Sequence, residues 1–404
     1  MHARLRGKPL INTELIPGGA RAGSNPFLII RFIRRKNPFQ MRFNLPIREP
    51  RKAVTRSQAL FIAAVVLIPV IAGYYYWFDR NQSAYGLQYV QPEEVGWSSQ
   101  KLDSLKPLVE ESGYAAMMAA YDGKVFYSWG KITTNYRIHS IRKPLESALY
   151  GIYVDRGEIY LDETLEDLDI DDIPPSLTSD EKQATVRELL QARSGVYHEA
   201  AAEDVSMIEL RPSRGSHPHG TFYYYNNWDF NVVLSIFEQK TGIDSLEAFK
   251  SEIADSIGME DFSLDNCHYS LEPEKSQYPA AQIRMSARDL LRFGVLYQKD
   301  GKWLDKQIVP SWWIEESTAT YSVVDEDSGI GYGYMWRTIP DVSSFAQVVG
   351  SSGYYHTGVG VQVVLVLPEL KLVIVQLMDT DTPGWVDPGD AGMQIGLEII
   401  NARN

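Results

Sequence analysis

The sequence predicts an α+β domain that follows a hydrophobic N-terminal segment. Patterns typical of strands lie near both ends of residues 97–404, and patterns typical of helices occupy the middle. This order fits one sheet built from both ends of the domain, with a helical insertion at about residues 158–285. The chain has 404 residues, of which 44% are hydrophobic and 12% aromatic. Such a chain can bury a large core, and its composition argues against disorder.

The N-terminal region has a charge and hydropathy pattern typical of membrane insertion. Residues 1–58 carry 13 Lys or Arg and 2 Asp or Glu, although the whole chain has a net charge of −13. Residues 59–78 contain no charged side chain and are long enough for a helix to cross a bilayer. We expect a basic cytoplasmic segment at 1–58, a transmembrane anchor at 59–78, a polar linker at 79–96 and an acidic domain at 97–404 on the far side.

Other interpretations of this region remain open. A basic arm can bind nucleic acid, but its position before a hydrophobic segment favours membrane orientation instead. Residues 59–72 could also be the core of a cleaved signal peptide that ends at Ala72, which would be ordinary if translation began at Met41 rather than Met1. We therefore expect a single-pass inner-membrane protein with a periplasmic domain, or a secreted protein if cleavage occurs. The oligomeric state stays open.

Each expected element of the outer domain has a start or stop signal. Thr185 and Glu188 form a capping box, and Asp122-Gly123 is typical of a tight hairpin turn. Glycines stop several helices. We expect, in order, a helix at 98–111 kinked at Pro107, strands at 115–121 and 124–129, helices at 140–156, 185–195, 228–240 (capped by Asn227), 246–257 and 286–298, strands at 359–367 and 370–378, and a helix at 391–402. The single cysteine, Cys267, excludes an internal disulfide.

The first candidate motif for catalysis is Ser140-Ile-Arg-Lys143. On a helix, Ser140 and Lys143 share one face, and the helix N-terminus favours a negatively charged oxygen. This pairing suits a serine nucleophile with a lysine base. The same spacing recurs at Ser98 and Lys101, where a helix start needs a serine cap. A capping serine and a solvated lysine is the structural alternative for Ser140 as well.

A second candidate motif supplies a phenol and an amide. It fits two registers, Tyr224 with Asn226 or Tyr225 with Asn227, and alternation alone does not choose between them. A tyrosine held between two cations can lose its proton and act as a base. The alternative is a pair of core aromatics beside a helix cap.

The third candidate motif, His356-Thr-Gly358, supplies a cation beside a glycine. We expect it to lead into an apolar strand, where the glycine lets substrate approach the backbone. A partly buried strand histidine is the alternative. Lys240-Thr-Gly242 has a similar pattern but ends a helix, so we do not assign it to the site.

Two further features lie in the long polar loop 196–220. We expect this loop to line or cover the cleft, with Tyr197 as a substrate contact. His217-Pro-His219 could suggest a metal, but no third ligand is nearby, and a solvated loop explains it better. We expect no metal and no other cofactor.

In this order, and 85 and 131 residues apart, the three motifs resemble the class C β-lactamase and penicillin-binding serine hydrolase superfamily. The resemblance covers roughly residues 90–402. It implies a five-stranded antiparallel sheet flanked by helices, plus an all-helical subdomain, with the active site between them. It further implies the following roles: Ser140 as the acylated nucleophile, Lys143 as its base, Tyr225 as general acid and base, Asn227 as a contact to the substrate amide, His356 at a position where many β-lactamases have lysine, Gly358 beside it, and the backbone N–H groups of Ser140 and Val359 as the oxyanion hole.

Histidine at position 356 is the main departure from the family pattern. A lysine there helps to bind the carboxylate of β-lactams, so we do not expect strong β-lactam hydrolysis. The sequence around the motifs is most similar to esterase-like and nylon-oligomer-hydrolase-like members. We predict a serine hydrolase that acts on ester or amide bonds of a small molecule or peptide. A D-alanyl-D-alanine peptidase or β-lactamase is the near alternative, and a non-catalytic binder of cell-wall peptides is the alternative from another class.

Overall fold

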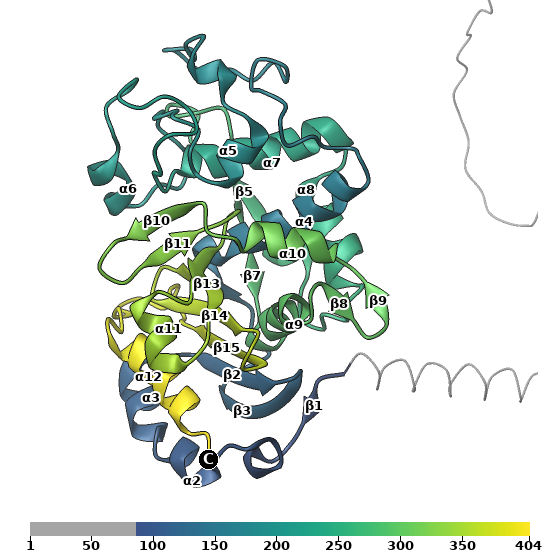
Figure 1. The fold of residues 1–404 in the computed structure, drawn as a ribbon, viewed down its shortest axis with the longest axis vertical. Coiled ribbons are helices and arrows are strands. Elements are labelled where there is room, and N and C mark those ends of the chain that lie inside the picture. Colours follow the sequence, from purple (N-terminus) through teal and green to yellow (C-terminus); the bar gives the residue numbers. More distant parts are fainter. Residues whose placement is uncertain (1–85) are drawn as a thin grey trace, which may run out of the picture. The chain divides into compact units, whose positions relative to one another are not determined.

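The computed structural model describes residues 86–404 (Figure 1). The predicted basic segment 1–58, the hydrophobic segment 59–78 and the first part of the linker lie outside the described residues. Within residues 86–404 no helix is both long enough and apolar enough to span a bilayer. All described residues belong to one compact unit.

Most of the strands belong to one large sheet. Its order is β1-β3-β2-β15-β14-β13-β12-β11-β10, and every pair is antiparallel except β1 with β3. The strands are β1 (Gln88–Tyr89), β2 (Ala116–Tyr121), β3 (Lys124–Gly130), β10 (Ser322–Asp325), β11 (Ile330–Tyr332), β12 (Arg337–Ile339), β13 (Gly353–Gly358), β14 (Gln362–Leu367) and β15 (Leu372–Leu377).

The nine-stranded sheet corrects the expectation of five strands. The five central strands, from β3 to β13, have the antiparallel pairing that the resemblance implied. Strands β12, β11 and β10 extend the sheet beyond β13, and β1 adds a parallel strand at the other edge. These added strands have only two to four residues each, so no run of alternating side chains marks them in the sequence.

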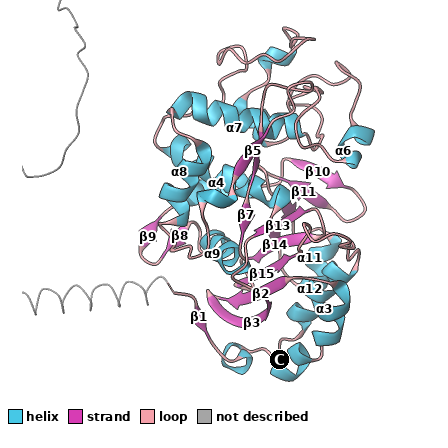
Figure 2. Ribbon diagram, turned by 180° about the vertical axis from the view of Figure 1, so that it is seen from behind, coloured by secondary structure: helices cyan, strands magenta, loops and turns pink. Residues whose placement is uncertain are grey.

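Helices cover both faces of this sheet and fill the region beyond its edge (Figures 1 and 2). The α-helices are α2 (Ser99–Asp103), α3 (Lys106–Ser112), α4 (Arg142–Asp155), α5 (Val186–Leu190), α6 (Val205–Leu210), α7 (Asn227–Thr241), α8 (Ser245–Phe249), α9 (Ala287–Gln298), α10 (Ser311–Ser317), α11 (Ser344–Val349) and α12 (Ala391–Asn401). The other short helices are η1 (Pro92–Val95), η2 (His139–Ile141), η3 (Glu181–Gln183), the π-helical η4 (Lys250–Ala254) and η5 (Leu264–Asn266).

The alternation of side chains along each strand produces two separate cores. Val364 and Val366 of β14 face the core that contains α4, α7 and α9. Leu365 and Leu367 face the opposite core, which contains α2, α3, α11 and α12. Figure 2 shows the sheet between these two helical layers. The active-site motifs lie on the α4 side.

The helical insertion holds short helices joined by long loops. It contains α5 to α8, which lie together at one end of the molecule in Figure 1. It also contains a two-stranded ladder, β5 (His268–Ser270) with β6 (Ala280–Gln282), so this part is not entirely helical. Two more small ladders join β4 (Tyr136–Arg137) to β7 (Arg284–Met285) and β8 (Lys302–Trp303) to β9 (Lys306–Gln307).

Several element boundaries differ from the expected ones for local reasons. The predicted kink at Pro107 is a complete break, because Pro107 lies in the first turn of a separate helix, α3. Asn226, rather than Asn227, caps α7 through a hydrogen bond from the Trp228 backbone N–H. The helix begun by the Thr185 capping box ends at Leu190, not at Gly195.

The strand expected at 359–367 begins only at Gln362. Gly360 and Val361 both have positive φ angles, of 83° and 51°, which form a turn between β13 and β14. His356 therefore lies inside a strand of its own, and Gly358 is the last residue of that strand.

Candidate active site

Ser140 and Lys143 are in direct contact at the start of α4. Ser140 lies in the 3-10 turn η2, which leads straight into α4. Lys143 Nζ and Ser140 Oγ are hydrogen-bonded at 2.9 Å. Ser140 is partly exposed, whereas Lys143 is buried. The hydroxyl can therefore be reached from outside while its partner amine is shielded from water.

The surroundings of Lys143 favour the neutral amine. Its Nζ lies 4.7 Å from the centre of the Tyr225 ring and 4.8 Å from that of Phe230. Burial lowers the pKa of Lys143 well below its usual value of 10.5, and the charge of neighbouring Arg142 lowers it further. A neutral amine at this distance from a hydroxyl can accept its proton.

The structure distinguishes the two registers of the tyrosine motif. The hydroxyl of Tyr224 donates to the Met207 carbonyl at 2.5 Å, and Asn226 caps α7, so this register has a structural role. Tyr225 instead packs against Lys143, and its ring centre lies 6.1 Å from that of His356. Tyr225 is therefore the tyrosine that meets the other two motifs.

Tyr225 is a protonated phenol at neutral pH. Burial raises its pKa to about 12, although Ser140, Arg337 and Arg142 oppose this rise. Its buried hydroxyl has no partner of standard hydrogen-bond geometry within residues 86–404. Such a group is poised to donate a proton rather than to accept one.

His356 is neutral, which differs from the expectation that this position supplies a cation. Its Nδ1 lies 2.9 Å from the Thr357 carbonyl oxygen, and because a carbonyl only accepts, Nδ1 carries the ring proton. Burial lowers the pKa of His356 well below 6.5, and the charges of Lys143 and Arg337 add to this effect. The buried Nε2 has no partner in the described chain and remains a free acceptor.

Arg337 supplies the cation that we expected from His356. It lies on β12, and its guanidinium carbon is 5.7 Å from the centre of the Tyr225 ring. The four side chains that most raise its pKa are tyrosines, and within residues 86–404 it forms no ion pair with an Asp or Glu. Arg337 is not among the predicted site residues, because nothing in its local sequence separates it from an ordinary surface arginine.

Gly358 allows a close backbone contact, and its predicted role beside the substrate stays a prediction. A Cβ atom at this position would lie 2.6 Å from the Ile138 carbonyl oxygen and 3.2 Å from Cβ of His139. The missing side chain therefore lets β13 pack against the segment that carries Ser140. Val359 follows in the turn and is 42% exposed. This packing brings the backbone of Gly358 and Val359 beside η2, and the oxyanion hole at Ser140 and Val359 stays a prediction.

The loop 196–220 is anchored beside the site. Asn227 donates from Nδ2 to the Ala202 carbonyl at 2.5 Å, and its buried Oδ1 has no partner in the described chain. Asp204, which caps α6, is close enough to influence the pKa values of Lys143 and Tyr225. Tyr197 makes ring contacts with Tyr224 and His217. Its role as a substrate contact stays a prediction.

Buried polar atoms without partners gather around this cluster. The ring centres of Tyr223 and Tyr332 lie 5.1 Å apart with the rings tilted, and the ring centres of Tyr332 and Tyr225 lie 6.1 Å apart, edge to face. Among residues 86–404, the orphaned atoms at the site are the hydroxyls of Tyr223, Tyr225 and Tyr332, Nε of Arg337, Nε2 of His356 and Oδ1 of Asn227. Because buried polar groups normally have hydrogen-bond partners, this gathering indicates a site built for a polar ligand.

The motifs that we did not assign to the site have other contacts. Ser98 caps α2, and Lys101 bonds to backbone carbonyls near the C-terminus. Lys240 pairs with Glu163. His217 stacks on Phe222 at 4.0 Å, and His219 bonds to Glu188 at 2.9 Å.

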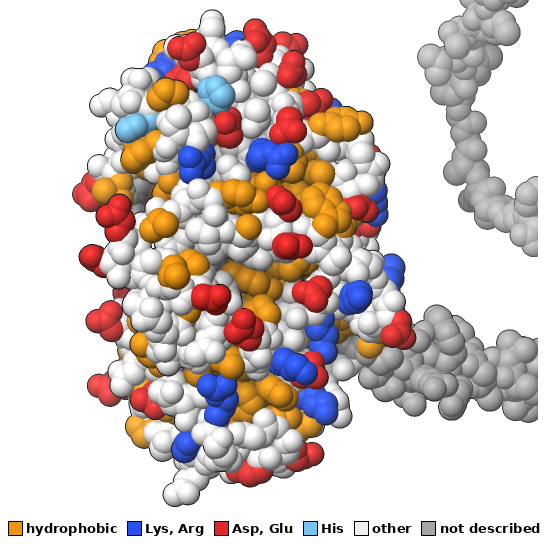
Figure 3. Space-filling model, viewed as in Figure 1, with side chains coloured by type: hydrophobic (Ala, Val, Ile, Leu, Met, Phe, Trp, Pro, Cys, Tyr) orange, Lys and Arg blue, Asp and Glu red, His pale blue; other side chains and the backbone are white. Residues whose placement is uncertain are grey.

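Charged side chains of both signs are interspersed on the face of the molecule that Figure 3 shows.

The sequence and the fold of this chain are similar to those of known proteins. A family model described as Beta-lactamase matches residues 105–394. No curated protein matches the sequence. The fold resembles a candidate 6-aminohexanoate-dimer hydrolase from Bacillus anthracis, with a TM-score of 0.56, 18% identity and coverage of 74% of this chain and 81% of that chain.

Two further solved structures have the same fold. An octameric penicillin-binding protein homologue from Pyrococcus abyssi gives a TM-score of 0.57 at 19% identity, covering 76% of this chain and 77% of the other. The D-alanine carboxypeptidase AmpC from Burkholderia cenocepacia gives 0.55 at 16% identity, covering 74% and 97%. At these identities the likeness shows the fold alone.

Proposed function

Because the chain belongs to the β-lactamase family of serine hydrolases, we propose that it hydrolyses ester or amide bonds of a small molecule or peptide through an acyl-enzyme on Ser140. The observation that carries this proposal is the 2.9 Å contact between the partly exposed Ser140 hydroxyl and the buried amine of Lys143. A solvated lysine would be charged and unable to act as a base. Here burial provides the neutral form.

The proposed reaction uses two groups with opposite protonation states. Lys143 accepts the Ser140 proton while the serine oxygen attacks the substrate carbonyl. Tyr225, a phenol with a pKa of about 12, donates a proton to the leaving alcohol or amine. Water then attacks the acyl-enzyme, with the deprotonated Tyr225 as its base, and this step restores the phenol. As the acyl bond breaks, Lys143 returns its proton to the Ser140 oxygen, so both groups recover their starting states. Environments that push two pKa values apart in this way support an acid and base assignment.

His356 favours esters and linear amides over β-lactams in this proposal. A neutral histidine whose Nε2 accepts a hydrogen bond provides no charge for a substrate carboxylate. It can instead accept a hydrogen bond from the Tyr225 hydroxyl or from a substrate N–H or O–H group.

A D-alanyl-D-alanine peptidase is the second candidate, and one observation favours it. Arg337 is a partly buried cation that forms no ion pair within residues 86–404, and it borders the same cluster. A terminal carboxylate on a peptide substrate is a suitable partner for such a guanidinium group. This candidate uses the same nucleophile and the same proton transfers.

A substrate panel separates these candidates. The test compares turnover of a short-chain nitrophenyl ester, a linear amide, a D-Ala-D-Ala peptide and a chromogenic cephalosporin. We expect the ester or linear amide to be turned over fastest. Fastest turnover of the D-Ala-D-Ala peptide would support the second candidate instead.

Two serine variants serve as the matched pair for this panel. Ser140→Ala is expected to lose all turnover, whereas Ser98→Ala removes a serine with the same spacing to a lysine and is expected to keep it. Turnover that persists in Ser140→Ala would contradict the proposal. Peptide binding by the wild type with no turnover of any substrate would favour a non-catalytic binder.

We also propose that residues 59–78 tether this domain to the inner membrane and that the domain faces the periplasm. The support is the uncharged segment, with the excess of basic residues before it. In spheroplasts, protease added from outside should digest the domain while the membrane stays intact. Protection from protease would contradict this orientation, and release of the domain into the medium would indicate cleavage after Ala72.

A further inference from the structure

An ion pair is buried beside Lys143 on the same helix. Arg142 and Glu146 are 4% and 7% exposed, and Arg142 Nη1 donates to Glu146 Oε1 at 2.5 Å. Arg142 directly precedes Lys143, and Glu146 lies one helical turn after it. The two charges therefore bracket the amine that contacts Ser140.

The pair is fixed from a second helix. Arg142 Nη2 donates to Oδ1 of Asn231 on α7 at 3.1 Å. Asn231 in turn donates from Nδ2 to the Ala201 carbonyl in the loop 196–220, also at 3.1 Å. Asn231 thus orients the guanidinium group while it holds the loop backbone beside the site.

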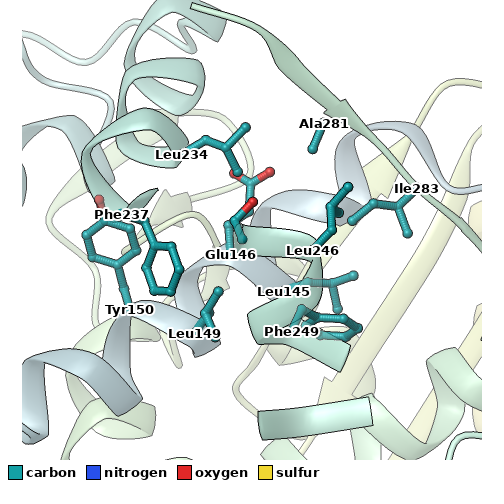
Figure 4. Close-up of a pocket in the computed structure, with 11 residues that line it drawn as sticks. Leu145, Glu146, Leu149, Tyr150, Leu234, Phe237, Leu246, Phe249, Ala281 and Ile283 are labelled. Atoms are coloured by element: carbon teal, nitrogen blue, oxygen red, sulfur yellow. The ribbon is translucent and has the colours of Figure 1, made fainter. Parts of the chain in front are cut away.

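The carboxyl group of Glu146 lies in apolar surroundings. Figure 4 shows it among aliphatic side chains that include Leu145, Leu234 and Leu246. Its Oε2 atom has no hydrogen-bond partner in the described chain. For a pair in such a place, desolvation offsets most of the Coulomb attraction, so a gain in stability does not account for it.

Lys143 experiences charges from several elements. On α4 these are Arg142 and Glu146, and on other elements they are Asp204 at the start of α6 and Arg337 on β12. Tyr225, His356 and His139 also face Lys143, and all three are neutral near pH 7. Arg142 and Glu146 influence the amine in opposite directions, and Arg142 has the larger effect.

We propose that Arg142 and Glu146 are positioning residues that control proton transfer from Ser140 to Lys143, with Asn231 holding them in place. The pair itself touches neither the substrate nor the serine and acts only through Lys143. This inference rests on the proposed function. It goes beyond it by assigning a role to side chains outside the three motifs.

The test measures the rate of Ser140 acylation by a nitrophenyl ester as a function of pH, in the full-length chain. Glu146→Gln leaves the Arg142 charge unbalanced, which lowers the pKa of Lys143. The acidic limb of the rate profile should then move to lower pH by about one unit. Arg142→Gln removes the larger effect, and the same limb should move about one unit to higher pH.

A matched control comes from a second buried ion pair. Arg292 and Asp289 on α9 are both 0% exposed, and neither is among the charges with the largest effect on the pKa of Lys143. Arg292→Gln should reduce thermal stability and leave the acidic limb where it is in the wild type. Circular dichroism confirms that each variant is folded before its profile is measured.

Opposite shifts from the two variants of one ion pair would support the inference, because a purely structural pair would not move the limb in two directions. An acidic limb at the same pH in the wild type and in both variants of the pair would overturn it, and so would shifts of that limb in the same direction. The proposed function fails in a different way, by the absence of acylation in the wild type at every pH.

Discussion

At the scale of single residues, the site depends on burial more than on residue type. Burial lowers the pKa of Lys143 and of His356, and it raises the pKa of Tyr225. The cation near Tyr225 is Arg337, a residue that no sequence motif marks. The protonation states therefore follow from packing that only the folded chain provides.

The dependence of rate on pH should reflect these protonation states. We expect kcat/KM to be low at acidic pH, to rise as Lys143 loses its proton at a pH well below 10.5, and then to stay level. No alkaline decline should occur until the pH approaches 12, where Tyr225 ionises. A bell-shaped profile centred near neutral pH would contradict these assignments.

Substitution of His356 by the lysine common in the family should be harmful here. The buried charge of His356→Lys would lie near the Arg337 cation and beside the buried amine of Lys143, and positive charge at either residue disfavours a cation at position 356. We expect a reduced Tm and at least about a tenfold loss of kcat/KM, because an unpaired buried charge is costly. His356→Gln keeps an acceptor without the charge and should have the higher Tm. Equal Tm values for His356→Lys and His356→Gln would contradict the expectation that a positive charge is unfavourable at this position.

At the scale of elements, the contact between β13 and η2 connects the three motifs. Gly358 ends β13 and allows its backbone to approach Ile138 and His139, directly before Ser140. His356, two residues earlier, is thereby placed beside Tyr225. One close backbone contact thus sets the position of the strand relative to the serine.

A methyl group at Gly358 should disturb this contact. In Gly358→Ala the new Cβ would lie 2.6 Å from the Ile138 carbonyl oxygen, so β13 or η2 must move. We expect a loss of about tenfold or more in kcat, because small displacements of catalytic groups are costly. The control is Gly396→Ala in α12, where the new methyl meets open space and helix propensity favours alanine. Equal activity of both variants would contradict the role of the contact.

At the scale of the whole molecule, the two ends of the described chain complete one core together. The Ser98 N–H donates to the Ala402 carbonyl, and α12 packs beside α3 on the face opposite the active site (Figure 1). Ile395, Ile399 and Ile400 of α12 are buried there. The large sheet, which carries part of the candidate site, is therefore supported on its other face by α12.

Removal of α12 should unfold the domain. Each buried isoleucine contributes about 1.5–3 kcal/mol, and the three together approach the whole stability of a typical domain. A chain that ends at residue 390 should lack a cooperative thermal transition and any acylation by an ester. A chain that begins at residue 86 should keep both. Acylation of the shortened C-terminal variant would contradict this account of the core.

The sequence was sufficient for the motifs and for the long elements around them. Helix α9, the hairpin of β2 and β3, and strand β15 lie close to their predicted positions, because each has a cap, a turn or a run of apolar residues. Short strands such as β11 and β12 have no such signal. The choice of Tyr225 over Tyr224, the neutral state of His356 and the contribution of Arg337 all depend on contacts between distant segments, so local patterns did not determine them.

The most direct test of the central claim is the mass of the intact protein after reaction with a fluorophosphonate. The account predicts one added phosphonyl group per chain, located on Ser140 by peptide mapping, and none in Ser140→Ala. Lys143→Met should fold but react far more slowly, because methionine has no basic nitrogen to accept the proton of Ser140. Labelling of Ser140→Ala at the wild-type rate, or an adduct on another residue, would contradict the claim.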